Sequence, residues 1–500
     1  MRVIDYCGPS WQNLRGDTRM TRGAMMEYME LFWTRVHETQ APAVHRASFK
    51  ASTAPTPLLL SMMLLGCYFS SLEAYKLACQ LHSGFRGKVL CSNDFRPRAE
   101  LWLHQTILLI VIFGKLCSTR MDHEMSHIFW SSCVTLGRRS AIFSQRAPAV
   151  FAPGHDDIET QWAAWIEEEV AKRIALIVFG VDVEHAAFFR HSPTLSAFQI
   201  QLQLPCDEEL WEARDAQEWA RLRVNARPPI PFISALKASL MAGHAPPALN
   251  PFSRIAILHG LLSVAQDLQW RDHVIGMSQP EGRANNWRDM ISASYNSWKS
   301  RLDTCLVTAT FPTSQLLRAS ISLYAIAHIT LSIDIHELQI YAGAESALGL
   351  VVSAAIYNAT EARIKLWSQT KDARAACWHA AFFLRSSLQH YQQSTVDLAG
   401  CLHHRWSVFI ATLTLYCYGR STSGEPGPRS ENYQEGAMRY LDTMCTNSPE
   451  GLLAVEGKNN TLDLCQTICE YVQASRWEIA QEGARILKVL LTKNPSPPKA

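Results

Sequence analysis

The sequence predicts an all-α protein that forms one large multi-helix domain in two packed halves. Apolar residues recur at helical spacing in most segments of the chain. Strict strand-like alternation occurs near residues 198–204, and no second alternating run is found to pair with it. Charged residues make up 18% of the 500 residues, below the roughly 25% usual for soluble domains, which indicates extensive burial.

The first half is expected to span residues 25–225, after a flexible tail at residues 1–24 that shows no periodicity. A helix is expected to begin near Thr21. The helices that follow in this half are Leu58–Tyr68, two helices within Leu101–Ser140, and Trp162–Phe189. In the last of these, Glu168 and Glu169 are spaced to pair with Lys172 and Arg173 on an exposed side. Residues 198–204 are expected to lie as a short extended segment across the helices.

Proline-rich stretches at residues 227–231 and 243–251 separate the two halves. The second half is expected at residues 250–493, with a disordered-looking insert at 419–436 and a tail at 494–500. Its expected helices are Phe252–Trp270, Trp287–Cys305, Ser314–Ile340, Ser346–Trp367, Ala373–Tyr391, Leu402–Tyr418, Gly436–Met444 and Leu462–Leu491.

Charge and cysteine content exclude several classes of protein. The net charge is +2, and no run of Lys and Arg marks a nucleic-acid surface or a nuclear import signal. The N-terminus lacks the apolar segment of a signal peptide. The apolar run Ile107–Phe113 is too short for a bilayer, which needs about 20 apolar residues, so no membrane partner is expected. The 14 cysteines are scattered and are interpreted as reduced core residues.

One motif suggests an enzyme. His123-Glu124-Met125-Ser126-His127 matches the His-Glu-x-x-His string of zinc peptidases, in which His123 and His127 would bind zinc and Glu124 would act as the base. The extended form of the motif fails, because Trp130 and Cys133 stand where Gly and His are required. A carboxylate from Glu167, Glu168 or Glu169 is the alternative third ligand.

The competing interpretation of this motif places it on the exposed side of an amphipathic helix. The apolar face of that helix would then run from Met125 through Ile128, Phe129 and Cys133 to Leu136, and would pack against the Ile107–Phe113 helix.

Other candidate sites are weaker. His379, His403 and His404 lie on helices rich in Trp and Leu and are expected to be packed, and Cys465 and Cys469 are expected to be core thiols. The sequence contains no nucleophile elbow, phosphate-binding glycine loop or dinucleotide fingerprint. We therefore expect no catalytic, cofactor-binding or metal-binding residues, no cofactor and no enzyme activity, with the zinc metallopeptidase as the alternative.

Several segments together resemble the fungal-specific regulatory domain, or middle homology region, of zinc-finger transcription factors. The resemblance covers most of the chain and is closest to the branch with two-Cys/two-His fingers. Its most specific piece runs from Trp162-x-x-Trp165-Ile166-Glu167 to Leu204-Pro205-Cys206-Asp207. The other matching pieces are His45-Arg46-Ala47-Ser48-Phe49, Leu101–Arg139, Trp211-Glu212-Ala213, Leu323–Asp334, Trp378-His379-Ala380, Trp406–Gly419 and Arg476-Trp477-Glu478-Ile479.

The resemblance implies an all-helical effector domain of a nuclear transcription regulator that controls a fungal gene set such as a secondary-metabolite cluster. It also implies other regulators or a second copy of the chain as partners. The sequence departs from the family in having no zinc-finger spacing, since Cys7 is followed by Cys67. DNA contact is therefore expected only indirectly or through a finger missing upstream of Met1.

A further departure is Cys401-Leu402-His403-His404-Arg405, where the family tends to have a Pro-His element. A small-molecule effector, in a pocket between the two helical halves, is a further possibility that no polar constellation locates.

Overall fold

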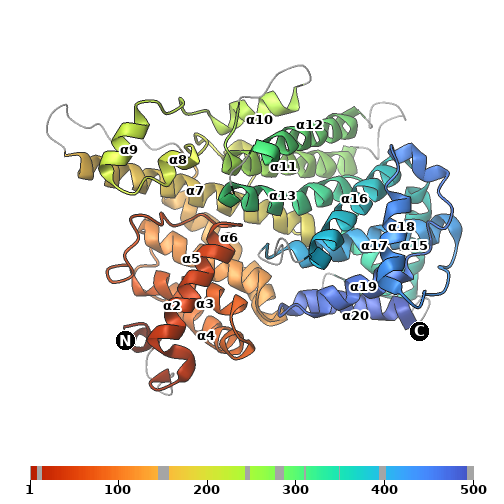
Figure 1. Cartoon of the computed structure of the whole chain (residues 1–500), viewed down its shortest axis with the longest axis horizontal. Helices are drawn as coiled ribbons and strands as arrows, with labels where there is room; N and C mark the ends of the chain where they lie inside the picture. Colours follow the sequence, from red (N-terminus) through yellow and green to blue (C-terminus); the bar gives the residue numbers. More distant parts are fainter. Residues whose placement is uncertain are drawn as a thin grey trace. The chain divides into compact units, whose positions relative to one another are not determined.

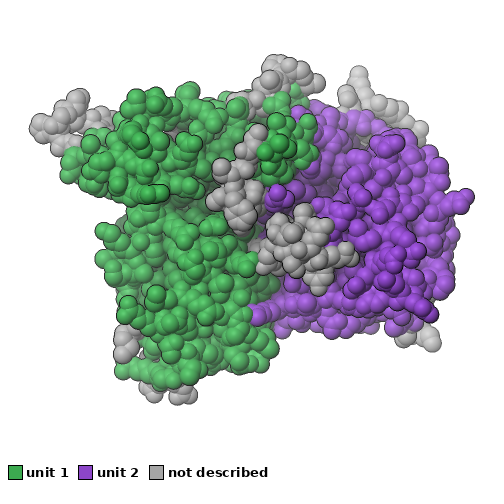
Figure 2. All heavy atoms as spheres, viewed as in Figure 1, with its two compact units in different colours: residues 1–183, 193–264, 300–317 green, residues 184–192, 265–299, 318–500 purple. Residues whose placement is uncertain are grey.

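The structure is a computed structural model that describes residues 2–7, 14–144, 157–241, 248–275, 286–308, 311–347, 350–393 and 401–492. The chain divides into two compact units (Figure 2). Unit 1 comprises residues 1–183, 193–264 and 300–317, and unit 2 comprises residues 184–192, 265–299 and 318–500. Helices dominate both units, which confirms the predicted all-α class.

Unit 1 is built mainly from the N-terminal helices (Figure 1). The elements from the N-terminus onward are α1 (Arg2–Cys7), the 3-10 turn η2 (Thr18–Met20), α2 (Arg22–Phe32), the π-helical turn η3 (Trp33–His37), α3 (Thr56–Phe69), α4 (Leu72–Leu90), α5 (Leu101–Leu116), α6 (Arg120–Arg139), α7 (Ile158–Phe189), η4 (Ala197–Gln199), α8 (Glu208–Trp211), α9 (Ala216–Arg223), α10 (Phe232–Leu240) and α11 (Pro251–Ile275).

Unit 2 contains most of the later elements. These are α12 (Asn286–Thr308), α13 (Phe311–Thr330), α14 (Ile335–Tyr341), β1 (Ser346–Ala347), β2 (Leu350–Val351), α15 (Ala354–Ser368), α16 (Lys371–Gln393), α17 (His404–Ser423), α18 (Tyr433–Met444), the 3-10 turn η7 (Pro449–Leu453), α19 (Leu462–Gln473) and α20 (Glu478–Thr492). Four helices, α7, α11, α12 and α13, contribute residues to both units.

In unit 1 the helices α3 and α5 form the core. Helix α3 packs against α2, α4 and α5, and α5 packs against α6. Every residue from Leu103 to Leu116 is buried, as the continuous apolar run in α5 predicts. Two glycines allow close helix contacts: a Cβ on Gly66 would lie 1.9 Å from the Tyr28 carbonyl oxygen, and one on Gly114 would lie 2.1 Å from Ser126 Oγ.

The segment expected to be an N-terminal tail, residues 1–24, contains α1, η2 and the start of α2. Its apolar side chains Val3, Leu14 and Met20 are buried. Helix α1 packs against α3. These contacts place part of the segment on the core of unit 1.

In unit 2, α17 is the central helix. It contacts α14, α15, α16, α19 and α20, and Figure 1 shows it beside α15 and α16. All of its residues from Trp406 to Gly419 are buried. A helix that is apolar all round is expected only where other helices surround it.

Extended structure is limited in the described residues. As expected, the region after Gln199 is extended. It bonds to two separate segments, through the N–H of Gln201 to the Phe143 carbonyl (2.9 Å) and the N–H of Leu204 to the Ile230 carbonyl (2.7 Å). Its first residues differ from the prediction, because they close the η4 turn. The two-residue strands β1 and β2, which pair in antiparallel register, are not predicted by the sequence pattern.

Among the described residues, no single helix is long and apolar enough to cross a membrane. One bent pair of helices meets the length and hydropathy criteria for a membrane span when its two members are combined. The pair is Leu316–Thr330 and Ile335–Tyr341, which meet at an angle of 78°.

Candidate functional site

The His-Glu-x-x-His string lies in the first half of α6. His123 is 6% exposed, and its Nδ1 lies 2.8 Å from the Lys115 carbonyl oxygen, so Nδ1 carries the hydrogen and donates it. The Nε2 atoms of His123 and His127 are 3.2 Å apart. Glu124 is exposed and forms an ion pair with Arg120 at 2.9 Å.

Two imidazoles at this separation can both contact one metal ion, but a zinc peptidase needs a third protein ligand and a base near the metal. Within the part of the chain that the structure describes, no group of three or more His, Cys, Asp or Glu side chains is arranged to hold a metal. Glu169, one of the proposed third ligands, is instead bound by Lys172, Arg173 and the N–H of Cys206.

The prediction for the buried face of α6 is correct only in part. Leu136 is buried, but Ile128 is 65% exposed, and Met125, Phe129 and Cys133 are half-buried. The buried side of the helix carries Asp122, His123, Ser126, Trp130, Val134, Leu136 and Gly137. Polar groups occupy the first turns of this side, so an analysis based on apolar residues alone places the buried face incorrectly there.

The buried carboxylate of Asp122 belongs to an electrostatic cluster that joins α4 and α6. The Asp122 carboxylate lies 3.0 Å from Arg86 Nη1 and 3.2 Å from His82 Nδ1, and it accepts a hydrogen bond from Ser118 Oγ at 2.7 Å. Burial alone would raise the pKa of Asp122, but hydrogen bonds and the charges of His82 and Arg86 outweigh it and lower the pKa to about 2. His82 Nε2 lies 3.0 Å from the Ile110 carbonyl, which ties the cluster to α5.

A second polar chain links α5, α6 and α7. The Lys115 ammonium lies 4.1 Å from the centre of the Trp130 ring, a cation–π contact in a buried site. Trp130 Nε1 donates to Asp182 Oδ1 (2.5 Å), and Asp182 Oδ2 accepts from the N–H groups of Thr194 and Leu195, both at 2.8 Å. Lys115 and Trp130 thus form part of the internal scaffold of unit 1.

Three of the segments that carry the family resemblance meet in unit 1. Arg173 is 2% exposed, pairs with Glu169 at 3.2 Å, and lies 4.0 Å above the Trp211 ring. His45 Nε2 donates to the Trp211 carbonyl oxygen at 2.8 Å. The prediction that Glu169 and Arg173 lie on an exposed side is wrong, because α8 and the chain before it cover this face of α7.

Unit 2 buries the histidines that were expected to be packed: His379, His403 and His404 are 7%, 4% and 3% exposed. The rings of His328 and His379 stack with centroids 3.6 Å apart. Burial lowers the pKa of His379 to about 3 and that of His328 well below its usual value, so both rings are neutral at pH 7. Cys465 and Cys469 are core thiols, as predicted.

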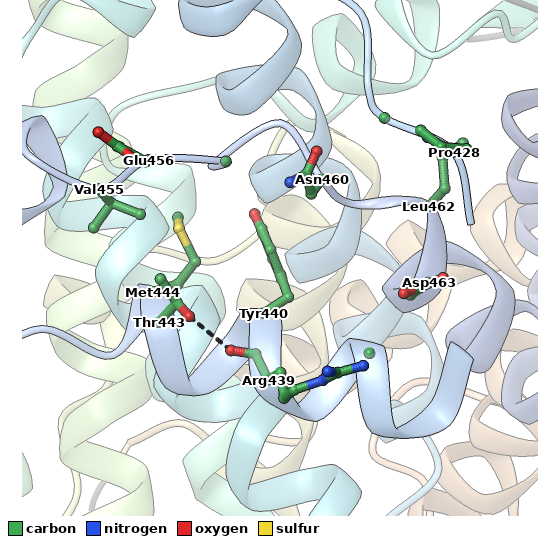
Figure 3. A pocket seen from close by; sticks show the side chains of 13 residues that line it. Pro428, Arg439, Tyr440, Thr443, Met444, Val455, Glu456, Asn460, Leu462 and Asp463 are labelled. Carbon is green, nitrogen blue, oxygen red and sulfur yellow. Dashed lines mark hydrogen bonds between the residues drawn. The ribbon is translucent and has the colours of Figure 1, made fainter. Parts of the chain in front are cut away.

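A cavity of about 340 Å³ lies in unit 2 between α18, the start of α19 and two loops (Figure 3). Its apolar lining is formed by Met444, Val455 and Leu462. The polar lining comprises Arg439, Tyr440, Thr443, Glu456, Asn460 and Asp463. Figure 3 shows Tyr440 extending from α18 toward the loop that carries Asn460.

Glycines keep this cavity open. A Cβ on Gly436 would lie 2.0 Å from Asp463 Oδ2, and one on Gly457 (φ +68°) would lie 2.7 Å from Asn460 Nδ2. Asp463 is held in place by the backbone N–H and the hydroxyl of Ser430, at 2.9 and 2.7 Å. Gly427, Pro428 and Gly436 belong to the segment 419–436 that was expected to be a disordered insert. The sequence signal for this site was therefore the spacing of its glycines.

Comparison with known proteins places this architecture among regulators. Residues 29–300 match the model of the family described as "Fungal specific transcription factor domain". The "Nicotinate catabolism cluster-specific transcription factor" of Emericella nidulans is 29% identical over 486 residues, which cover 94% of this chain and 55% of that protein. "Zinc finger protein klf1" of Schizosaccharomyces pombe is 30% identical over 488 residues, which cover 94% of this chain and 61% of that protein.

"Zinc finger protein zas1" of Schizosaccharomyces pombe is 26% identical over 489 residues, covering 95% of this chain and 54% of the relative. The chain thus spans between 54% and 61% of the length of these relatives. No solved structure matches the chain significantly.

Proposed function

Because the chain belongs to the fungal-specific transcription factor domain family, we propose that it acts in the nucleus as the regulatory domain of a transcription regulator, without catalysis. The observation that carries this proposal is the match of residues 29–300 to the family, with similarity to named transcription factors over 94% of the chain. One of those relatives is named for a catabolic gene cluster. We therefore propose a metabolic gene cluster, catabolic or secondary, as the target.

The direct test is to tether the full chain to a heterologous DNA-binding domain in a fungal host and to measure a reporter gene. We expect reporter transcription to change relative to the DNA-binding domain alone. Glu124→Gln provides a matched control that separates regulation from peptidase chemistry, since Glu124 is exposed and would be the base of the peptidase. Equal reporter activity with and without the tethered chain would contradict the proposal. Loss of activity in Glu124→Gln would support the metallopeptidase alternative.

DNA binding is proposed to come from a partner or from a zinc finger that is not in these 500 residues. The sequence contains no finger spacing and has a net charge of +2, so it lacks the basic surface that phosphate contacts require. A gel shift with the chain alone at about 150 mM salt should show no sequence-selective complex. Sedimentation velocity of the same sample tests the proposed self-association, which predicts a mass that increases with concentration.

We further propose that the 340 Å³ cavity of unit 2 receives a small-molecule effector. Arg439 supplies a cation next to an apolar wall, a combination suited to a small aromatic carboxylate. Nicotinate is the first probe, because one relative is named for nicotinate catabolism.

Calorimetric titration of the chain with nicotinate should show saturable binding. Arg439→Gln should weaken it at least about tenfold, as expected for loss of one charge-assisted contact. Arg385→Gln is the control, since Arg385 pairs with Asp442 and does not line the cavity. Equal affinity of the two variants would exclude this site for nicotinate.

A further inference from the structure

We propose that Cys401 is a reactive nucleophile and a site of oxidation by small hydroperoxides, activated by His403. The two residues form a turn directly before α17, and both are 4% exposed. Cys401 Sγ lies 3.3 Å from His403 Nε2. Ser322 Oγ, from α13, lies 3.0 Å from the same nitrogen, and Glu184 Oε2, from α7, lies 3.8 Å from His403 Nδ1.

Hydrogen-bond accounting assigns the protons in this cluster. Ser322 donates its hydroxyl hydrogen to the Ala319 carbonyl at 2.7 Å, so its oxygen can only accept from His403 Nε2. Nε2 must therefore carry a hydrogen, which also points toward the sulfur. The other ring nitrogen faces the Glu184 carboxylate, an arrangement that favours the doubly protonated imidazolium.

The shortest contact of the Cys401 sulfur is the one to His403 Nε2, at 3.3 Å. Ser322 Oγ and the Ala319 carbonyl oxygen lie farther from it, at 4.0 and 3.9 Å. The Nε2–H group of His403 is therefore placed to donate to the sulfur when Cys401 reacts as a nucleophile. The charges of Cys401 and Glu184 outweigh the effect of burial and raise the pKa of His403 to about 9, which agrees with an imidazolium at neutral pH.

Two other buried thiols, Cys67 and Cys469, have no hydrogen bond to an imidazole among the described residues. Cys67 and Cys469 are 4% and 3% exposed, close to the value for Cys401. Cys469 Sγ lies 3.5 Å from the Ala484 carbonyl, a contact that favours the protonated thiol. Burial raises the pKa of both of these thiols. They therefore serve as controls of equal burial without an imidazole.

The proposed reaction uses hydrogen peroxide or an organic hydroperoxide as the oxidant. The Cys401 thiolate attacks one peroxide oxygen, an S–O bond forms and the O–O bond breaks. The leaving group, hydroxide from hydrogen peroxide or alkoxide from an organic hydroperoxide, takes a proton from the His403 imidazolium and departs as water or as an alcohol. The products are cysteine sulfenic acid at Cys401 and a neutral His403 ring. Hydrogen peroxide has two heavy atoms, so brief local opening of the turn is sufficient for access.

The experiment treats the native full chain with hydrogen peroxide, traps sulfenic acid with dimedone, and measures the labelled fraction of each cysteine by peptide mass spectrometry. At pH 7 we expect Cys401 to be labelled at least about tenfold faster than Cys67 and Cys469, because His403 lies 3.3 Å from its sulfur and can protonate the leaving group. Its rate should change little between pH 6 and 8, whereas the control rates should rise with pH. The polar groups that face the Cys401 sulfur and the His403 ring are Glu184, Ser322 and the Ala319 carbonyl.

Two variants locate the source of the reactivity. His403→Phe keeps a ring beside Phe188, whose ring centre lies 5.3 Å from that of His403. This variant should reduce the Cys401 rate at least about tenfold. Glu184→Gln keeps the Cys401–His403 contact, and it should restore a pH-dependent rate below pH 8 by weakening the imidazolium. Equal rates for Cys401, Cys67 and Cys469 in the parent chain would overturn the proposal, and so would the absence of labelling at Cys401. A Cys401 rate that neither variant changes, with both variants folded by circular dichroism, would also overturn it.

Discussion

Replacement of Asp122 by Asn tests how much the buried charge cluster stabilises α6. The substitution preserves the shape of the side chain but removes the negative charge that faces His82 and Arg86. The Arg86 guanidinium remains buried at 8% exposure, beside the fully buried ring of His82. Leaving a buried charge without its partner costs about 3–5 kcal/mol. The free energy for opening α6 should fall by that amount at pH 7.

The lowered pKa of Asp122 gives a second value for the free energy by which the ionised carboxylate stabilises the folded state. The decrease from 3.8 to about 2 corresponds to about 2.5 kcal/mol of coupling between ionisation and folding. Because the folded pKa lies below the unfolded one, this stabilisation is fully present above about pH 4 and is lost as the pH falls through 2. The difference in stability between the parent chain and the variant should therefore become about 2.5 kcal/mol smaller at low pH.

Hydrogen–deuterium exchange of peptides from α6 measures this opening locally and does not require two-state unfolding of the whole chain. At pH 7 the variant should exchange roughly a hundredfold to a few thousandfold faster than the parent. Glu124→Gln is the control on the same helix. Its ion pair with Arg120 is about half exposed and should contribute under about 0.5 kcal/mol. If Asp122→Asn changed exchange no more than Glu124→Gln, the inferred role of the cluster would be wrong.

Other predictions concern helix contacts and acid stability. Gly114→Ala should lower the Tm, with a loss of about 1–3 kcal/mol, because its Cβ would lie 2.1 Å from Ser126 Oγ. Gly87→Ala, which meets no atom within 4 Å on helix α4, should raise the Tm slightly. The neutral pair of His328 and His379 should make unit 2 lose stability as the pH falls below 6.5, since the unfolded chain binds protons that the folded chain does not. His379→Phe should reduce that loss of stability by about 2.5 kcal/mol between pH 6.5 and 4.5. Hydrogen–deuterium exchange of peptides from α16 measures the effect, and an unchanged pH dependence would contradict the prediction.

Most helices of this protein could be predicted from the sequence, but their bounds and the faces that they bury could not always be. Helix α4 was not predicted, and the segments Ser314–Ile340 and Leu462–Leu491, each predicted as one helix, form two helices each. The predicted helix Ser346–Trp367 begins with β1 and β2. Helix α5 is apolar throughout and is correctly expected to be core. Helix α6 carries Asp122 and His123 toward the core, and their burial depends on partners such as Arg86 that lie far away in the sequence. A residue-by-residue hydrophobic pattern contains no information about those partners. Charged residues therefore appear exposed unless the ion pair is known.

The same limit explains what was missed at the candidate sites. The Cys401–His403 contact is local, but its activation depends on Ser322 and Glu184, which come from α13 and α7. The cavity of unit 2 depends on the close approach of Gly436 to Asp463. By contrast, the resemblance identified the family without any structure, because it rests on local strings such as Trp162-x-x-Trp165.

The division of the chain into units has a consequence for how this domain can be cut and recombined. Unit boundaries fall after residues 183, 192, 264, 299 and 317, so the backbone passes between the units five times. A fragment that ends near residue 240 lacks residues 248–264 and 300–317, which belong to unit 1. No single cut therefore releases either unit intact. Gene fusions, proteolytic fragments and exchanges between relatives should preserve function only when they contain all segments of both units.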